Sequence, residues 1–98
     1  MSVFMLVEAR TIDLEKYTQY ISQVSRLVVQ YGGRYLVRGG KITPLGNDWN
    51  PERIIILEFP SEERVREWLS SPEYKAIAPL REAGAETRAV LLEGLNGV

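Results

Sequence analysis

Two carboxylates and two arginines are the side chains through which this chain could carry out chemistry. Glu58 lies in an otherwise apolar run, and Asp48 lies in a polar segment between Arg38 and Arg53. A carboxylate on a covered sheet face has a raised pKa and can act as a general base. An ion pair between Glu58 and Arg34 or Arg38 is the competing interpretation, since structural ion pairs also perturb pKa values. Glu58 and Asp48 are therefore the candidate catalytic residues.

Arg38 and Arg53 are also candidates for binding a ligand. A guanidinium binds a carboxylate through two parallel hydrogen bonds, and the nearby Trp49 could clamp the body of an organic acid. Surface salt bridges, or anchoring of the loop through Asp48, are the competing interpretation. The pattern predicts a site for an organic acid at the mouth of a cleft, formed by Arg38, Trp49 and Arg53.

Three further aromatic residues, Tyr20, Trp68 and Tyr74, are candidates for lining a pocket. Flat rings between helices and a sheet could contact a planar ligand. Such side chains more often belong to the core, with the hydroxyl or indole N–H reaching a partner. Tyr17 is expected in the core, and Tyr74 also belongs to a helix cap that begins at Ser71. We therefore predict ligand contacts for Tyr20, Trp68 and Tyr74.

The residues that the chain lacks exclude several kinds of site. There is no histidine and no cysteine among the 98 residues. Catalytic Ser-His-Asp and Cys-His arrangements, histidine-ligated haem and nearly all zinc sites are therefore excluded. The glycine pairs at 32–33 and 39–40 lack the spacing of a phosphate-binding loop. We expect no metal and no cofactor.

Charge and hydropathy restrict the partners and the compartment. The net charge is −1 and the isoelectric point is near 5.5, whereas a nucleic-acid-binding domain needs a basic face. The longest apolar runs are far shorter than a membrane span, and the N-terminus does not resemble a signal peptide. The absence of cysteine agrees with a reducing compartment. We expect a cytoplasmic protein that binds neither nucleic acid nor a membrane.

The order of the expected elements predicts the fold. Strands are expected at 2–10, 34–41, 52–59 and 86–93, and helices at 13–31 and from 61 onward, with a restart at Ser71 and a kink or break at Pro79. The order βαββαβ with right-handed crossovers is typical of an α+β, ferredoxin-like fold, in which a four-stranded antiparallel sheet carries its helices on one face. Residues 1–98 are expected to form one domain.

Two strands of this sheet predict a second copy of the chain. The runs Val3–Val7 and Ile54–Leu57 are apolar at every position, so both faces of the central strands require cover. Two helices cover one face, and the other would expose a large apolar patch. A two-fold homodimer, packed sheet against sheet, covers it most simply. The alternative is a monomer in which the loop 42–51 covers the second face.

Several segments resemble a known family. They are GGRYLVRGG at 32–40, DWNPER at 48–53, ILEFPS at 56–61, WLSSPEY at 68–74 and LEG at 92–94. Together they are similar to the DUF1330 family over nearly the whole chain. The resemblance implies a dimeric α+β barrel, and it implies no established function.

Two functions from different classes remain open. The first is a small homodimeric protein that binds a small organic molecule, for example one bearing a carboxylate, between sheet and helices. The second is a cofactor-independent isomerase or monooxygenase, in which Glu58 or Asp48 abstracts a proton and a Tyr or Arg stabilises the oxyanion. This second function rests on analogy of fold. The surroundings of Glu58 distinguish the two.

Overall fold

The elements follow the predicted order closely. The structure is a computed structural model that describes residues 2–46 and 48–95. Over these residues the elements are β1 (Val3–Thr11), α1 (Leu14–Gln30), β2 (Arg34–Arg38), β3 (Arg53–Phe59), α2 (Glu62–Ser70), α3 (Pro72–Gly84) and β4 (Ala85–Glu93). The second expected helix is divided into α2 and α3 at Ser71. None of the helices in the described residues is long and apolar enough to cross a membrane.

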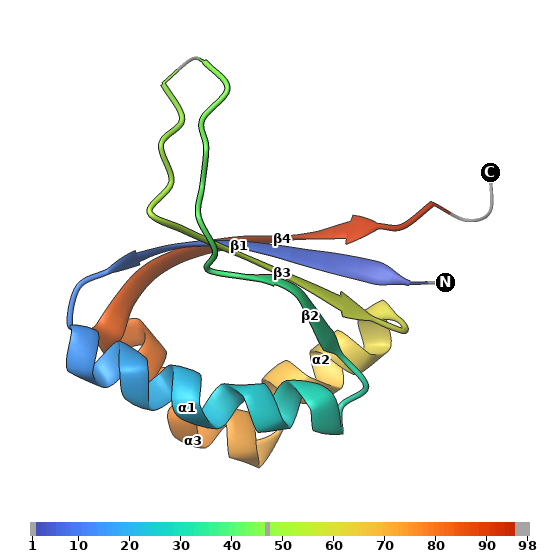
Figure 1. Cartoon of the computed structure of the whole chain (residues 1–98). Helices are drawn as coiled ribbons and strands as arrows, with labels where there is room; N and C mark the ends of the chain where they lie inside the picture. Colours follow the sequence, from blue (N-terminus) through green and yellow to red (C-terminus); the bar gives the residue numbers. More distant parts are fainter. Residues whose placement is uncertain (1, 47, 96–98) are drawn as a thin grey trace.

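The sheet has the ferredoxin-like strand order. Its strands lie in the order β2-β3-β1-β4, and every neighbouring pair is antiparallel. The helices all lie on one face, as Figure 1 shows, and we call this the inner face of the sheet. β1 and β3 are the central strands, which confirms the prediction made from the order of the elements, and they contain the two continuous apolar runs. The predicted α+β fold is therefore confirmed.

The core lies between the helices and the inner face. Alternate residues of the central strands point to this side, with Val3 opposite Phe59 and Met5 opposite Leu57. Phe59 and Val28 of α1 are both 0% exposed, and the Phe59 and Trp68 rings stack at 5.3 Å between centroids. Hydrophobic burial against α1, α2 and α3 thus fixes which strand residues face the helices.

Side-chain caps and one close approach fix the ends of the helices. The Asp13 carboxylate accepts a hydrogen bond from the Lys16 amide at 3.2 Å. The Ser71 hydroxyl accepts from the Tyr74 amide at 3.1 Å, so it begins α3 as predicted. Pro79 does not end α3, which continues to Gly84. A Cβ atom on Gly84 would lie 2.6 Å from the Tyr17 amide nitrogen, so glycine allows α1 and α3 to approach.

A β-bulge in β2 changes which side chains face the helices. Strict alternation would place Tyr35 and Val37 on one face and Arg38 on the other. The register instead pairs Tyr35 with Leu57 and Arg38 with Ile55, and it shifts between Tyr35 and Val37. The bulge therefore turns both Tyr35 and Arg38 toward the helices, and Val37 toward the outer face. The strand ends at Arg38, earlier than predicted, because Gly39 adopts a φ of +72°.

The outer face of the sheet is apolar, and no other part of the described chain covers it. Val37, Val90 and Leu92 are 39%, 54% and 48% exposed. Residues 39–46 and 48–52, which we call the arm, rise away from this face rather than lying across it (Figure 1). The arm therefore does not provide the cover that a monomer would need.

Candidate functional site

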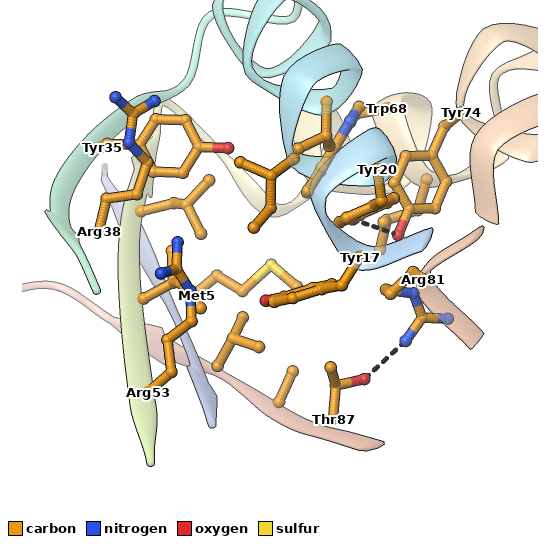
Figure 2. Close-up of a pocket in the computed structure, with 17 residues that line it drawn as sticks. Met5, Tyr17, Tyr20, Tyr35, Arg38, Arg53, Trp68, Tyr74, Arg81 and Thr87 are labelled. Atoms are coloured by element: carbon orange, nitrogen blue, oxygen red, sulfur yellow. Dashed lines mark hydrogen bonds between the residues drawn. The ribbon is translucent and has the colours of Figure 1, made fainter. Parts of the chain in front are cut away.

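A cavity lies between the inner face of the sheet and the helices. Its volume is about 360 Å³, within the range of small-molecule sites. Side chains from every strand and every helix named above line it, as Figure 2 shows. They are Met5, Val7, Tyr17, Tyr20, Ile21, Val24, Tyr35, Arg38, Arg53, Ile55, Leu57, Trp68, Leu69, Tyr74, Arg81, Thr87 and Ala89.

Aromatic side chains from the three helices form one wall of the cavity. The rings of Tyr17 and Tyr20 stack with their centroids 6.1 Å apart, and Tyr74 meets Tyr20 edge-on at 6.2 Å. The Tyr20 and Tyr74 hydroxyls share a hydrogen bond of 3.0 Å. Trp68 meets Tyr74 edge-on at 5.1 Å. These contacts hold flat apolar surfaces in fixed orientations, which suits a flat organic ligand.

Burial keeps two phenol groups of the cavity lining, those of Tyr20 and Tyr35, protonated at neutral pH. Burial raises the pKa of Tyr20, and the neighbouring Tyr74 raises it further. Burial also raises the pKa of Tyr35, although its hydrogen bond with Ser25 and the charge of Arg38 act in the opposite direction. Neutral phenols can donate hydrogen bonds to an anion, and they are poor general bases.

Arg53 of β3 is one of three arginines that line the cavity. Its guanidinium lies over the Tyr17 ring, 5.9 Å from the centroid. Within residues 2–46 and 48–95 it has no ion-pair partner, and its Nε is buried without a hydrogen-bond partner. A Cβ atom on Gly39 would overlap this guanidinium, so the absence of a side chain at Gly39 leaves room for the guanidinium of Arg53. A buried donor without a partner carries a free-energy cost that a bound acceptor would remove.

Arg38 lies at the rim on the same side of the cavity as Arg53 (Figure 2). Its guanidinium is 4.9 Å from the centroid of the Tyr35 ring, and its Nη1 donates to the Ser25 hydroxyl at 3.1 Å. Among the residues that the structure describes, no carboxylate pairs with it. Arg38 and Arg53 therefore keep their charge available to a ligand at this rim.

A third arginine lies on the opposite side of the cavity (Figure 2). Arg81 of α3 donates from Nη1 to the Thr87 hydroxyl at 2.7 Å, and its Nη2 lies 3.9 Å from the Glu82 carboxylate. Sequence reasoning did not select Arg81, Thr87 or Tyr35 as ligand contacts. Helical spacing offered a signal for Arg81, because it lies seven residues after Tyr74 and therefore on the same side of α3.

The lining as a whole is rich in hydrogen-bond donors and poor in acceptors. Guanidinium, phenol and indole groups supply its polar atoms, together with the Thr87 hydroxyl. Among the described residues, no Asp, Glu or Lys lines the cavity. The same part of the chain contains no cluster of Asp and Glu that could hold a metal ion. The electrostatics of this cavity therefore favour an anion.

Glu58 lies outside the cavity, on the outer face of the sheet. It pairs across the strands with Arg34, whose Nε and Nη2 lie 2.8 Å and 2.7 Å from one carboxylate oxygen. The hydrogen bonds from Arg34 hold its pKa below the ordinary value, with a further contribution from Ser2. The prediction of Glu58 as a base with a raised pKa is therefore wrong, because it accepts charged donors on a partly exposed surface. The competing interpretation, an ion pair with Arg34, is confirmed.

Asp48 and Trp49 lie on the arm and do not line the cavity. Asp48 is exposed, and Trp49 is 55% exposed. The arm leaves the sheet toward the outer side, whereas the cavity lies on the inner side (Figure 1). Trp49 thus does not line the cavity with Arg38 and Arg53, with which sequence reasoning had grouped it. Tyr20, Trp68 and Tyr74 do lie together in the cavity, as expected for a shared pocket.

Comparison with known proteins identifies the family. A family model described as a domain of unknown function, DUF1330, matches residues 2–95. The chain belongs to the DUF1330 family. The match confirms the resemblance to this family that was inferred from the sequence segments between residues 32 and 94. No curated protein matches this DUF1330 chain.

Solved structures share the fold of this DUF1330 protein. A protein of unknown function from Rhodopseudomonas palustris, RPA0582, is 21% identical with a TM-score of 0.81, over 97% of this chain and 83% of its own. SnoaB, a cofactor-independent oxygenase from Streptomyces nogalater, is 9% identical with a TM-score of 0.66, over 97% of this chain and 94% of its own. A dimeric ferredoxin-like protein of unknown function from Thermobifida fusca is 14% identical with a TM-score of 0.60, over 96% of this chain and 92% of its own.

These likenesses concern the fold of the DUF1330 protein. The neighbours include dimeric proteins with a ferredoxin-like fold, in agreement with the predicted fold class. At these identities they carry no information about a ligand or a reaction.

Proposed function

We propose that this DUF1330 protein binds a small organic anion in the cavity between sheet and helices. The ligand has a flat, apolar body that contacts the aromatic wall, and a carboxylate that pairs with Arg53 and Arg38. The observation that carries this proposal is Arg53, a guanidinium without an acidic partner among the described residues, beside a cavity of about 360 Å³.

The composition of the lining supports an anion over a neutral ligand. Charge-assisted hydrogen bonds between guanidinium and carboxylate are about twice as strong as neutral ones. The low local dielectric of an apolar cavity strengthens them further. An anion would also give the buried Nε–H of Arg53 an acceptor, which it lacks among the described residues.

Calorimetric titration with 2-naphthoate and with its uncharged analogue 2-naphthamide tests the proposal. The two probes have nearly the same shape and differ in charge. We expect 2-naphthoate to bind at least about tenfold more tightly, since hydrogen bonds to charged groups contribute about 1.5–3 kcal/mol. Arg53→Gln should abolish most of this difference. Arg66→Gln is the matched control, because Arg66 lies on the surface of α2 and pairs with Glu62.

Equal affinities for the acid and the amide would contradict the proposal. So would an Arg53→Gln variant that retains the preference for the acid. A wild-type protein that binds neither probe, nor a set of smaller and larger aromatic acids, would also contradict it.

We further propose that the protein forms a homodimer through the outer face of the sheet. Val37, Val90 and Leu92 form an exposed apolar patch there. Ion pairs Arg34–Glu58 and Arg88–Glu8 border the patch, a composition typical of an interface with an apolar centre and polar rim. Neighbours described as dimeric, with the same fold, add support. Sedimentation at a series of concentrations should give a species of twice the 11.2 kDa chain mass.

A cofactor-independent enzyme is the second candidate function. The donor-rich lining favours it, because the same groups would stabilise an enolate or another oxyanion in a transition state. No carboxylate among the described residues lines the cavity, so this part of the subunit provides no carboxylate base to deprotonate a substrate. The substrate would therefore have to enter the cavity already ionised. Oxygen uptake in the presence of ligands found by titration tests this function. Binding without oxygen uptake or conversion of the ligand would leave binding as the function.

A further inference from the structure

The arm is a long segment without regular secondary structure. Residues 39–46 and 48–52 contain no helix or strand, and they project from the outer side of the sheet (Figure 1). Leu45 is 97% exposed and Trp49 is 55% exposed. Loops of this length without secondary structure are uncommon in compact domains, and they are usually functional loops or else linker or disordered segments. The arm therefore exposes two large apolar side chains on the outer side of the sheet.

Both ends of the arm are fixed to the sheet. The Gly39 amide donates to the Ile54 carbonyl at 3.0 Å, and the Thr11 amide donates to the Glu52 carboxylate at 2.9 Å. Pro44 and Pro51 restrict the backbone between these anchors. The arm consequently leaves the sheet in a defined direction, on the same side as the apolar outer face.

The reach of the arm exceeds the spacing between two packed sheets. Sheets that pack face to face lie about 10 Å apart. An extended chain advances about 3.3 Å per residue, so Leu45, six residues beyond Gly39, can lie about 20 Å from the sheet. Trp49, four residues before Arg53, can lie about 13 Å away by the same measure. In a sheet-to-sheet dimer, the arm is therefore long enough for Leu45 and Trp49 to reach past the plane of the partner's sheet.

We propose that the arm of each subunit extends past the edge of the partner's sheet, where Leu45 and Trp49 pack against the partner subunit. The proposal rests on the dimer proposed above. A second copy is the occupant because the arm and the apolar patch face the same side, so a copy that covers the patch must lie beside the arm. Two-fold symmetry provides two such contacts in each dimer. Tryptophan is among the residues that contribute most to interface affinity.

Photo-crosslinking from the arm tests the contact directly. The chain has no native cysteine, so Leu45→Cys provides a single site for a benzophenone maleimide label. We expect irradiation of the dimer to give a covalent species of twice the chain mass on a denaturing gel. Ala76→Cys is the matched control, because Ala76 is exposed on α3, in the helical layer, and should give no such species.

A second variant tests the arm without a label. Trp49→Ala should raise the dissociation constant of the dimer by at least about tenfold, measured by sedimentation, because two contacts are lost per dimer. Leu14→Ala is the control, since Leu14 is 71% exposed on α1 and its truncation should leave the constant unchanged. Far-ultraviolet circular dichroism establishes that each variant is folded.

The outcomes distinguish the arm from the dimer. A dimer in which the labelled Leu45→Cys variant crosslinks only within its own chain, and in which Trp49→Ala leaves dissociation unchanged, overturns the arm contact while the dimer stands. A protein that is monomeric at every concentration overturns the dimer, and the arm contact with it. Crosslinking between chains together with a weakened Trp49→Ala dimer supports both.

Discussion

The two faces of the sheet use similar side chains for different purposes. On the inner face, residues such as Phe59 and Leu57 are 0% and 3% exposed, and helices enclose a cavity with arginines around it. On the outer face, Val90 and Leu92 remain about half exposed, at 54% and 48%, and the charged residues pair with one another. Hydropathy is thus alike on both faces, whereas the pairing of charges differs.

This difference indicates where a ligand and where a protein partner would bind. Charges that pair within the subunit, such as Arg34 with Glu58, have little to offer a small anion. Arg38 and Arg53 have no carboxylate partner among the described residues and lie beside a cavity. The inner face is therefore suited to an organic anion, and the outer face to a second subunit.

The largest expected effect comes from truncating the inner face. Phe59→Ala removes a ring with 0% exposure that stacks on Trp68. We expect the free energy of unfolding to fall by about 3–5 kcal/mol, through lost burial and the new cavity. Urea denaturation followed by circular dichroism measures this loss. Leu92→Ala on the outer face should cost the subunit far less, and equal losses at the two positions would remove the contrast between the faces.

A charge on the outer face should act on the dimer instead. Val90→Lys places an unpaired ammonium in each half of the proposed interface, which is costly once the surface is buried. We expect the dimer dissociation constant to rise about a hundredfold, equal to about 2.7 kcal/mol. Sedimentation measures the change, with Thr18→Lys on the exposed side of α1 as the control. A Val90→Lys dimer as tight as the wild type would show that the outer face is not the interface.

The Tyr20–Tyr74 hydroxyl pair should contribute a smaller amount. Tyr20→Phe removes their hydrogen bond of 3.0 Å, so we expect a loss of about 1 kcal/mol in unfolding free energy.

Burial raises the pKa of Tyr20 above its ordinary value of 10.0, so the folded state keeps a proton that the unfolded chain releases in alkali. Stability should therefore be intact below about pH 10 and fall above it. Tyr20→Phe should flatten this decline in urea denaturation between pH 8 and 11. A decline that is as steep in Tyr20→Phe as in the wild type would contradict the assignment.

The smallest expected effect concerns Glu58. The exposed Arg34 pair contributes little to stability, so Glu58→Gln should leave the unfolding free energy at neutral pH close to that of the wild type. Because Arg34 lowers the pKa of Glu58, its small contribution is present above the ordinary carboxyl pKa of 4.5 and is lost as the pH falls. Affinity for 2-naphthoate should stay unchanged. A loss of affinity in a folded Glu58→Gln variant would return Glu58 to the binding site.

The sequence predicted the fold because its signals were local and consistent. The order of the elements identified β1 and β3 as central, in agreement with their continuous apolar runs, and Asp13 and Ser71 marked the starts of helices. Residue spacing placed Tyr74 on the apolar side of its helix and Tyr20 at the edge of an apolar stripe, and both residues are buried. Periodicity and capping depend on neighbouring residues, so a single sequence carries them.

The site was harder to predict because it depends on a β-bulge in β2 and on the side of the sheet toward which the arm projects. A bulge beside Leu36 turns Arg38 toward the helices, and simple alternation assigns it to the other face. The arm carries Asp48 and Trp49 to the outer side, although they are close in sequence to Arg53. Nearness along the chain does not determine which face of a sheet a loop leaves.

Binding of an anion at Arg53 can be followed through the arginine Nε–H signals in nuclear magnetic resonance spectra during titration with 2-naphthoate. Among residues 2–46 and 48–95, Arg53 Nε has no hydrogen-bond partner, so its signal should respond when a carboxylate binds. We predict a saturable shift of the Arg53 signal, identified by its loss in Arg53→Gln, while the Arg66 signal stays in place. An unmoved Arg53 signal, or equal shifts of surface arginines, would contradict an anion site in this cavity.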